Sequence, residues 1–258
     1  MSRPPYIRVA TVDDLDELAS MTQRAFISSP AQSYLANLRL PLTTAPKDTR
    51  ARENQVDFIK YLIRRAWHLQ GRITVVVLPC PPSTPRAPQR DANKEQIIAC
   101  SVWRPPVAGA ARKSPSGIND LRLGLLGLLS SWGLGLTARI AEFVQPIERA
   151  FQEGWKHRNL PTNPDGSWHL QLAGVDPEFQ GQGYMSMLLL EAFQNAGPKA
   201  IFTLEATTPR ARDIYTHFGF EIVKEVVIGK GKVDAHGIAA SGESAVGFPV
   251  YPMIRTGR

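Results

Sequence analysis

The stretch Val175-Asp-Pro-Glu-Phe-Gln-Gly-Gln-Gly-Tyr-Met185 decides how the rest of the chain is interpreted. Before it, residues 168–175 begin with alternating side chains and predict a strand, and after it residues 183–195 have the apolar spacing of a helix. Glycines between a strand and a helix let backbone N–H groups approach a phosphate, which the helix N-terminus also attracts. The alternative is a plain turn, in which the glycines only permit a tight bend.

Two well-known phosphate loops do not fit these residues. A dinucleotide-binding fingerprint needs a third glycine and an acidic residue at the end of a second strand, and neither stands at the right distance. A Walker A loop needs Gly-Lys-Ser or Gly-Lys-Thr, and no such triplet follows Gly183. The segment therefore predicts either a phosphate site of another kind or the plain turn.

The composition is that of an ordinary globular protein. Of the 258 residues, 43% are apolar and 21% are charged, so one domain over residues 1–258 is expected. The formal net charge of +7 favours an anionic partner. That partner could be a nucleic acid, an acidic membrane or a phosphorylated cofactor. Because the basic residues are scattered, the alternative is a solvated basic surface, and we do not expect a nucleic-acid partner.

Several other function classes are not favoured. The two cysteines, Cys80 and Cys100, lack metal-ligand spacing, so no metal site is expected. The apolar stretch 121–136 is too short and too mixed to span a membrane, and it predicts a buried core helix instead. The first eleven residues lack the apolar core of a signal peptide. We therefore expect a cytoplasmic protein without a membrane partner.

Outside the loop, the pattern predicts a mixed α/β chain in which strands and helices alternate. A Pro-rich segment at 79–95 predicts a mobile loop inside a hairpin, residues 118–158 predict a helical insertion, and residues 229–245 predict a Gly-rich loop. The predicted strands are 6–10, 73–78, 96–103, 168–175, 200–206, 220–228 and 246–253, and the predicted helices besides the insertion are 12–26, 33–40, 48–69, 183–195 and 209–218.

A second conspicuous segment follows about 30 residues later, Leu204-Glu-Ala-Thr-Thr-Pro-Arg-Ala-Arg-Asp-Ile-Tyr-Thr-His-Phe-Gly-Phe220. Together, the two segments resemble motifs A and B of the GNAT superfamily of N-acetyltransferases, and the resemblance covers residues 168–228. Motif A reads Arg/Gln-x-x-Gly-x-Gly/Ala after Val-x-Pro, and motif B ends in Tyr-x-x-x-Gly-Phe. Met185 stands where the family prefers Gly or Ala. The wording Leu-Glu-x-x-x-Pro-Arg is most similar to puromycin N-acetyltransferase-like members.

The resemblance implies a fold and a cofactor. The fold would be a mixed, mostly antiparallel central sheet flanked by helices, with the helical insertion before the cofactor-binding strand. The cofactor would be acetyl-coenzyme A, with its pantetheine arm along the strand and its pyrophosphate on the loop. The implied cofactor-binding residues are Leu172, Ala173, Gly174, Val175, Gln180, Gly181, Gln182, Gly183, Tyr184, Met185, Arg210 and Tyr215.

Three residues are candidates for catalysis. Tyr215 stands at the family's general-acid position, and its alternative role is packing beside the cofactor. Glu205 is a candidate base, directly or through water, and its alternative role is a structural hydrogen bond. His169 has a suitable ordinary pKa for a base, although a histidine within a strand more often belongs to a hydrogen-bonded sheet face.

The resemblance implies direct transfer of an acetyl group from acetyl-coenzyme A to a primary amine. We expect a small-molecule acceptor and a protein that is a monomer or a homodimer. The alternative is a non-catalytic acyl-coenzyme A-binding or scaffold protein on the same fold, because fold alone does not fix function.

Overall fold

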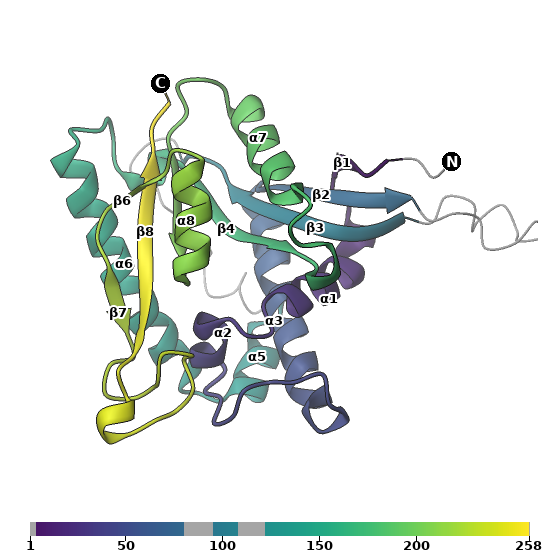
Figure 1. Cartoon of the computed structure of the whole chain (residues 1–258), viewed down its shortest axis with the longest axis vertical. Helices are drawn as coiled ribbons and strands as arrows, with labels where there is room; N and C mark the ends of the chain where they lie inside the picture. Colours follow the sequence, from purple (N-terminus) through teal and green to yellow (C-terminus); the bar gives the residue numbers. More distant parts are fainter. Residues whose placement is uncertain (1–3, 80–94, 108–121, 258) are drawn as a thin grey trace, which may run out of the picture.

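The computed structural model describes residues 4–79, 95–107 and 122–257. Most of the predicted Pro-rich loop at 79–95 and the first residues of the predicted insertion lie outside these ranges. The described chain is built around one mixed sheet with helices on both faces (Figure 1). The predicted class, a GNAT-type mixed sheet flanked by helices, is confirmed.

The central sheet contains strands from the whole length of the chain. Its order is β1-β2-β3-β4-β5-β8-β6, and β7 also pairs with β8. In the described chain, the pair β4–β5 is parallel and every other named pair is antiparallel. The strands are β1 (Tyr6–Val9), β2 (Arg72–Pro79), β3 (Glu95–Arg104), β4 (Trp168–Val175), β5 (Phe202–Ala206), β6 (Glu221–Ile222), β7 (Val226–Ile228) and β8 (Phe248–Arg255).

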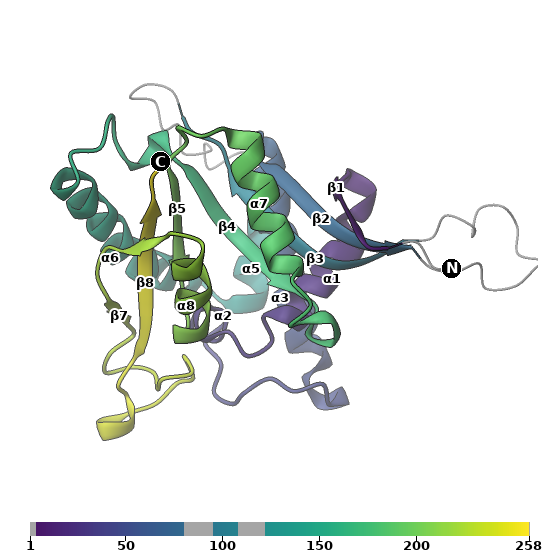
Figure 2. The ribbon, with the colours of Figure 1, turned by 45° about the horizontal axis from the view of Figure 1, so that its top comes forward.

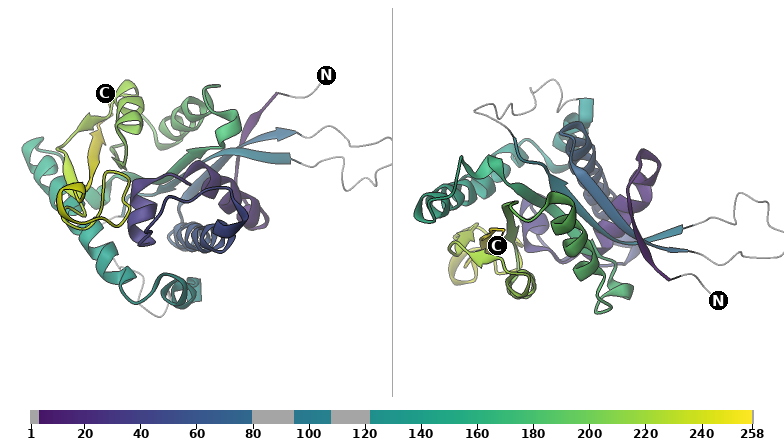
Figure 3. Two further views of the ribbon diagram at one scale, coloured as in Figure 1. Left: turned by 60° about the horizontal axis from the view of Figure 1, so that its bottom comes forward. Right: turned by 90° about the horizontal axis from the view of Figure 1, so that it is seen from above.

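Different helices cover the two faces of the sheet (Figure 3). Helices α7 (Tyr184–Ala196) and α8 (Pro209–His217) lie on one face, where residues of β4, β5 and β8 form a core with them. Helices α1 (Leu15–Ala25) and α3 (Thr49–His68) cover β2 and β3 on the other face. On that second face, α2 (Pro30–Leu35), α5 (Leu125–Trp132) and α6 (Leu136–His157) share a further core with β7 and β8.

The strands β4 and β5 separate within the sheet. Their pairing runs from Trp168 opposite Phe202 to Leu170 opposite Leu204 and stops there. At the same point, the register between β3 and β4 skips Gln171, because Trp103 pairs with Leu170 and Val102 pairs with Leu172. Such a bulge bends its strand. Both strands continue beyond this point without pairing to each other, and Figure 2 shows their ribbons diverging. This unpaired region is called the opening between β4 and β5.

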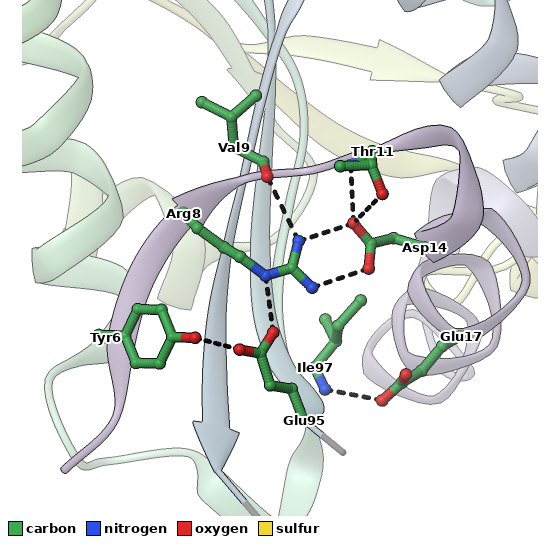
Figure 4. Close-up of polar contacts among 8 residues, drawn as sticks. All are labelled: Tyr6, Arg8, Val9, Thr11, Asp14, Glu17, Glu95 and Ile97. Atoms are coloured by element: carbon green, nitrogen blue, oxygen red, sulfur yellow. Dashed lines mark hydrogen bonds and ion pairs between the residues drawn. The ribbon is translucent and has the colours of Figure 1, made fainter. Parts of the chain in front are cut away.

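A polar cluster fastens the first strand to the sheet (Figure 4). The guanidinium of Arg8 donates two hydrogen bonds to Asp14, at 2.7 and 2.8 Å, and one to Glu95 at 2.8 Å. Glu95 also accepts from the hydroxyl of Tyr6. Nearby, Glu17 of α1 accepts from the backbone N–H of Ile97 at 2.7 Å, next to a bulge in the β2–β3 register. These contacts join β1, α1 and β3.

Two predicted elements have different limits in the structure. The predicted strand at 220–228 is wrong as one element, because it is divided into β6 and β7. The break faces Pro252 of β8, which has no backbone N–H to donate across the gap, while its carbonyl accepts from Val223 at 2.8 Å. The predicted helix at 33–40 is shifted to α2, because Ser29 caps its start and the left-handed Asn37 follows its end.

The prediction of a buried core helix at 121–136 is wrong, because only part of this stretch is buried. Helix α5 buries Leu128 and Trp132, whereas Leu126 is 63% exposed and Leu134, after the helix, is 84% exposed. The few polar residues in this stretch, Arg122, Ser130 and Ser131, do not recur at helical spacing, so the sequence could not show which residues face the core. In the part of the chain that the structure describes, no helix has the length and apolar composition to cross a membrane.

Candidate active site

The predicted phosphate loop follows β4 and leads into α7. After the 3-10 turn Pro177–Phe179, Gly181 has a φ of +80° and Gly183 a φ of +85°, and Gly183 is the N-cap residue of α7. Side chains other than glycine are strained in this left-handed region. A Cβ atom at either glycine would meet no atom within 4 Å, so the space beside the loop is open. The loop can therefore receive an anion at the positive end of α7.

The loop is anchored to α1 through a buried carboxylate. Asp176, only 3% exposed, accepts two hydrogen bonds from Arg24 of α1, at 2.5 and 2.9 Å. Its other oxygen accepts from the backbone N–H of Glu178 at 3.3 Å. Gln180 donates from Nε2 to the carbonyl of Val175, also at 3.3 Å. Arg24 is a residue that the sequence analysis missed, because its partner is 152 positions away and no local pattern connects them.

The remaining loop side chains leave the glycines uncovered. Met185 packs against the apolar core that α7 and α8 share with the sheet. The hydroxyl of Tyr184 donates to Gln182 at 3.2 Å, so these two side chains pair with each other. The larger side chain at position 185 is therefore accommodated in the core.

A cleft of about 650 Å³ lies between α7 and α8, on the same face of the sheet as the loop. Arg210, predicted from the sequence, lines this cleft together with Ser186. Further lining residues are Asp213, Ile214, His217 and Phe218. The cleft, the loop and the opening between β4 and β5 suit an extended anionic molecule, because they offer a cation, helix N–H groups and a strand edge without a β5 partner.

His169 and Glu205 meet on the face of the sheet opposite α7 and α8. Nε2 of His169 lies 3.3 Å from Oε2 of Glu205, and the side chains are 16% and 23% exposed. Nδ1 of His169 lies 3.1 Å from Oγ1 of Thr203, which in turn lies 2.9 Å from Oγ of Ser167. The ring of Phe151 on α6 packs edge-on against the imidazole, with centroids 6.2 Å apart. The structure thus brings the two predicted base candidates together.

The surroundings of Glu205 favour its ionised form. Burial acts to raise the pKa of this carboxyl group, but the ion pair and hydrogen bond with His169 and the charge of Arg104 together hold it below its ordinary value. Glu205 is therefore a carboxylate at neutral pH, and it can attract an ammonium group or take up a proton.

The surroundings of Tyr215 favour the protonated form of its hydroxyl group. Burial raises the pKa of this phenol, and the nearby Glu205 and Cys100 raise it further. Cys100 of β3 pairs with Gly174 of β4, whereas Glu205 belongs to β5. Tyr215 itself belongs to α8 and packs in the core that α7 and α8 share with β4 and β5. It keeps its proton at neutral pH and is suited to donate it.

Among the described residues, no group of three or more His, Cys, Asp or Glu side chains is arranged to hold a metal ion. The described residues of the site offer a carboxylate–imidazole pair, a protonated phenol and backbone N–H groups. His169 and Glu205 lie together on one face of the sheet, whereas Tyr215 of α8 packs in the core on the opposite face.

Comparisons with known proteins agree with this geometry. The family model of the acetyltransferase (GNAT) domain matches residues 150–222, which contain β4, the loop, α7, β5 and α8. No curated protein matches the sequence. The fold is also similar to solved acetyltransferase structures, at sequence identities that show the fold alone.

Three of these structures cover nearly the whole chain. A histone acetyltransferase HPA2 and related acetyltransferase from Corynebacterium glutamicum is 17% identical, with a TM-score of 0.55, covering 100% of this chain and 98% of that one. An arylalkylamine N-acetyltransferase 2 from Aedes aegypti is 11% identical, with a TM-score of 0.52 and coverages of 98% and 99%. A polyamine N-acetyltransferase from Drosophila melanogaster is 13% identical, with a TM-score of 0.50 and coverages of 98% and 100%.

The match of residues 150–222 to the acetyltransferase (GNAT) domain supports acetyl-coenzyme A-dependent N-acetyltransferase activity, and the solved structures show that the fold is the GNAT fold. The domain that the family model matches contains the phosphate loop and Tyr215, and acetyl-coenzyme A is the cofactor of this class.

Proposed function

We propose that the protein transfers the acetyl group of acetyl-coenzyme A to a primary amine of a small molecule by direct attack. The observation that carries the proposal is the opening between β4 and β5. The glycine loop follows β4 at its far end, Tyr215 packs on the α7 and α8 side of the sheet, and the His169–Glu205 pair lies on the other side. In the proposal, these groups act as the phosphate site, the acid and the base.

The residues around the gap fit the cofactor. In the proposal, the β5-facing edge of Leu172–Val175 lies along the pantetheine arm, residues Gln180–Met185 hold the pyrophosphate, and Arg210 adds a positive charge in the cleft. The uncovered space at Gly181 and Gly183 supports this assignment. When bound, acetyl-coenzyme A supplies an activated acetyl thioester, whose acetyl group passes to the amine nitrogen while the sulfur leaves with one proton.

The side chains at the gap have complementary tasks. An alkylammonium group has an ordinary pKa near 10, so it must lose a proton before its nitrogen can react. We assign this proton to the His169–Glu205 pair, whose carboxylate also attracts the ammonium ion. Tyr215, which keeps its proton, is assigned as the donor to the leaving sulfur, and the second proton that the nitrogen loses on becoming an amide restores the Tyr215 hydroxyl.

A small acceptor is supported by the way the base side of the gap is covered. The loop at 229–245 reaches α2 and the residues after it, where the N–H of Ala239 donates to the carbonyl of Leu38 at 2.9 Å. Lys232 of this loop pairs with Glu142 of α6 at 2.8 Å, and Glu142 also accepts from Tyr34 of α2. These contacts favour an enclosed acceptor over an extended peptide.

Two weaker similarities agree with a small amine. The wording Leu-Glu-x-x-x-Pro-Arg at 204–210 is similar to that of puromycin N-acetyltransferase-like proteins. Two proteins of similar fold have names that specify small amines, arylalkylamine and polyamine. Their low sequence identity means that they support the class of acceptor without specifying it.

Cofactor binding can be tested with a matched pair of glycine variants. Gly183 and Gly197 both have a φ of +85°, and both have free space around a Cβ atom, but they lie at opposite ends of α7. We expect titration calorimetry to show binding of acetyl-coenzyme A by the wild type and by Gly197→Val, and loss of binding in Gly183→Val. Absence of binding by the intact protein would reject both this proposal and the scaffold alternative.

Catalysis is tested separately from binding. Release of free coenzyme A thiol is measured with acetyl-coenzyme A and a panel of monoamines, diamines, aminoglycosides and an N-terminal peptide. Release with a small amine and not with the peptide is expected. Tight cofactor binding without release for any amine would instead favour a non-catalytic acyl-coenzyme A-binding or scaffold protein.

A further inference from the structure

Three buried side chains form a hydrogen-bonded chain that ends on His169. Ser167, just before β4, and Thr203 of β5 are each 2% exposed. Oγ of Ser167 lies 2.7 Å from the carbonyl oxygen of Pro164 and 2.9 Å from Oγ1 of Thr203. Oγ1 of Thr203 lies 3.1 Å from Nδ1 of His169. Sequence analysis identified neither hydroxyl, because the register of β4 and β5 is what brings them together.

The direction of each hydrogen bond in this chain follows from counting hydrogens. A carbonyl oxygen can only accept, so the hydroxyl of Ser167 donates its one hydrogen to Pro164. The contact between the two hydroxyls must then use the hydrogen of Thr203, which donates to Ser167. With its own hydrogen committed, Thr203 can only accept from the imidazole. Nδ1 of His169 therefore carries a hydrogen.

This assignment determines what faces Glu205. In the neutral imidazole only one nitrogen carries a hydrogen. With that hydrogen on Nδ1, Nε2 carries no hydrogen, and it lies 3.3 Å from the carboxylate oxygen Oε2 of Glu205. That arrangement is favourable only when one proton lies between Nε2 and Oε2. The pair is therefore a receptor for a single proton, and in its proton-free state it is ready to accept one.

We propose that Ser167 and Thr203 are positioning residues that fix the tautomer of His169, so that Nε2 and Glu205 together receive the proton of the acceptor amine. The proton-receiving part rests on the proposed function, whereas the fixed tautomer is a property of the protein itself. The fixed tautomer matters because the other one would place a hydrogen on Nε2, where the proton from the amine has to bind.

Other groups around the pair determine when it is proton-free. Arg104 of β3 adds a positive charge, and Tyr215 of α8 adds a neutral phenol that interacts with Glu205. From α6, the apolar ring of Phe151 packs on the imidazole. The hydroxyl chain differs from these groups because it acts on one nitrogen of the ring and not on the charge of the site.

The tautomer can be read without any activity. In cofactor-free protein labelled with ¹⁵N-histidine, two-bond proton–nitrogen correlations distinguish Nδ1–H from Nε2–H, and His169→Gln identifies which of the five histidines is observed. In the wild type, we expect neutral His169 to carry its hydrogen on Nδ1. In Thr203→Val, which has a similar shape without the hydroxyl, the hydrogen should move largely to Nε2. Thr203→Ser should restore Nδ1–H.

A wild-type protein with neutral His169 in the Nε2–H form would overturn the proposal, and so would a tautomer that Thr203→Val leaves unchanged. If Thr203→Val does not fold, Ser167→Ala provides the second test. Without Ser167, the hydroxyl of Thr203 is free to donate to Nδ1, so a mixture of tautomers is expected. An unchanged Nδ1–H in a folded Ser167→Ala would contradict the orienting role of that hydroxyl.

The consequence for turnover is measured with an amine that supports thiol release. We expect Thr203→Val to lower kcat/KM by about 10- to 100-fold, less than the roughly 100- to 10,000-fold contribution of a general base, because the base is misoriented and not removed. The pH profile should also change its shape, while the dissociation constant of acetyl-coenzyme A stays the same and Thr203→Ser recovers most of the loss. Unchanged kcat/KM in a variant whose tautomer has moved would reject the proton-receiving role. Thiol release absent even in the wild type would instead be a failure of the proposed function.

Discussion

At the scale of single residues, burial gives the polar groups around the gap different protonation states. Tyr215 keeps its proton because burial and the nearby Glu205 raise its pKa. Glu205 stays ionised because His169 and Arg104 outweigh the effect of burial. Amine acetylation requires an acid that holds its proton and a base that has lost its proton at neutral pH. Tyr215 and Glu205 have these two protonation states.

The role of Tyr215 predicts the behaviour of Tyr215→Phe. Removing the hydroxyl should lower kcat by about 100-fold, in the usual range for one general acid, and leave cofactor affinity unchanged. Because the pKa of Tyr215 is raised, the hydroxyl should remain protonated up to at least pH 10, so its titration should not limit kcat between pH 6 and 10. Steady-state kinetics of thiol release check both points.

The matched control is Tyr6→Phe, at the far edge of the sheet, where the hydroxyl contacts Glu95. Its kcat should equal that of the wild type. If Tyr215→Phe were as active as this control, Tyr215 would be a packing residue of the α8 core, as its contact with Phe220 at 5.8 Å also permits.

At the scale of secondary-structure elements, the cluster of Arg8, Asp14 and Glu95 joins β1 to α1 and β3. The hydrogen bonds from Arg8 lower the pKa of Asp14. A carboxyl group whose pKa is lower in the folded state stabilises the fold above its unfolded pKa of about 4, and this contribution is lost as the pH falls through the folded pKa.

Asp14→Asn should therefore be less stable than the wild type at pH 7, by about 1 kcal/mol for a partly exposed pair. The difference should shrink below about pH 4. Urea unfolding at pH 7 and pH 3 measures it, and Asp13→Asn, at the exposed neighbouring position, should have almost no effect at either pH. An equal loss of stability at both pH values would mean that the charge of Asp14 contributes nothing.

The sequence was sufficient for the elements whose signals are local. The loop glycines, the Pro at the start of α8 and the apolar spacing of α7 predicted the cofactor-binding segment and its place between strand and helix. The bulge at Gln171 was not predictable, because no residue in β4 marks it and it depends on the register with β3. Ser167, Thr203 and Arg24 were missed for the same reason: their partners lie on other elements.

At the scale of the whole molecule, cofactor binding is expected to stabilise the fold. A ligand that binds only the folded state at 100 times its dissociation constant adds about 2.7 kcal/mol to the free energy of unfolding. For a chain of this size, that corresponds to a rise in Tm of about 5–10 °C. Thermal scans with and without acetyl-coenzyme A measure the rise, which Gly197→Val should retain and Gly183→Val should lose. A rise of equal size in Gly183→Val would place the cofactor elsewhere.

The short pairing between β4 and β5 has a mechanical consequence. Three residue pairs connect the half of the sheet that contains β1 to β4 with the half that contains β5 to β8. Next to this junction, the ring of Trp103 on β3 meets that of Phe202 on β5 with centroids 5.4 Å apart. Packing of these rings therefore adds to the short backbone pairing in joining the two halves. We therefore expect a change in the side-chain volume at Phe202 to change the angle between the two halves of the sheet. The affinity for acetyl-coenzyme A should change with it.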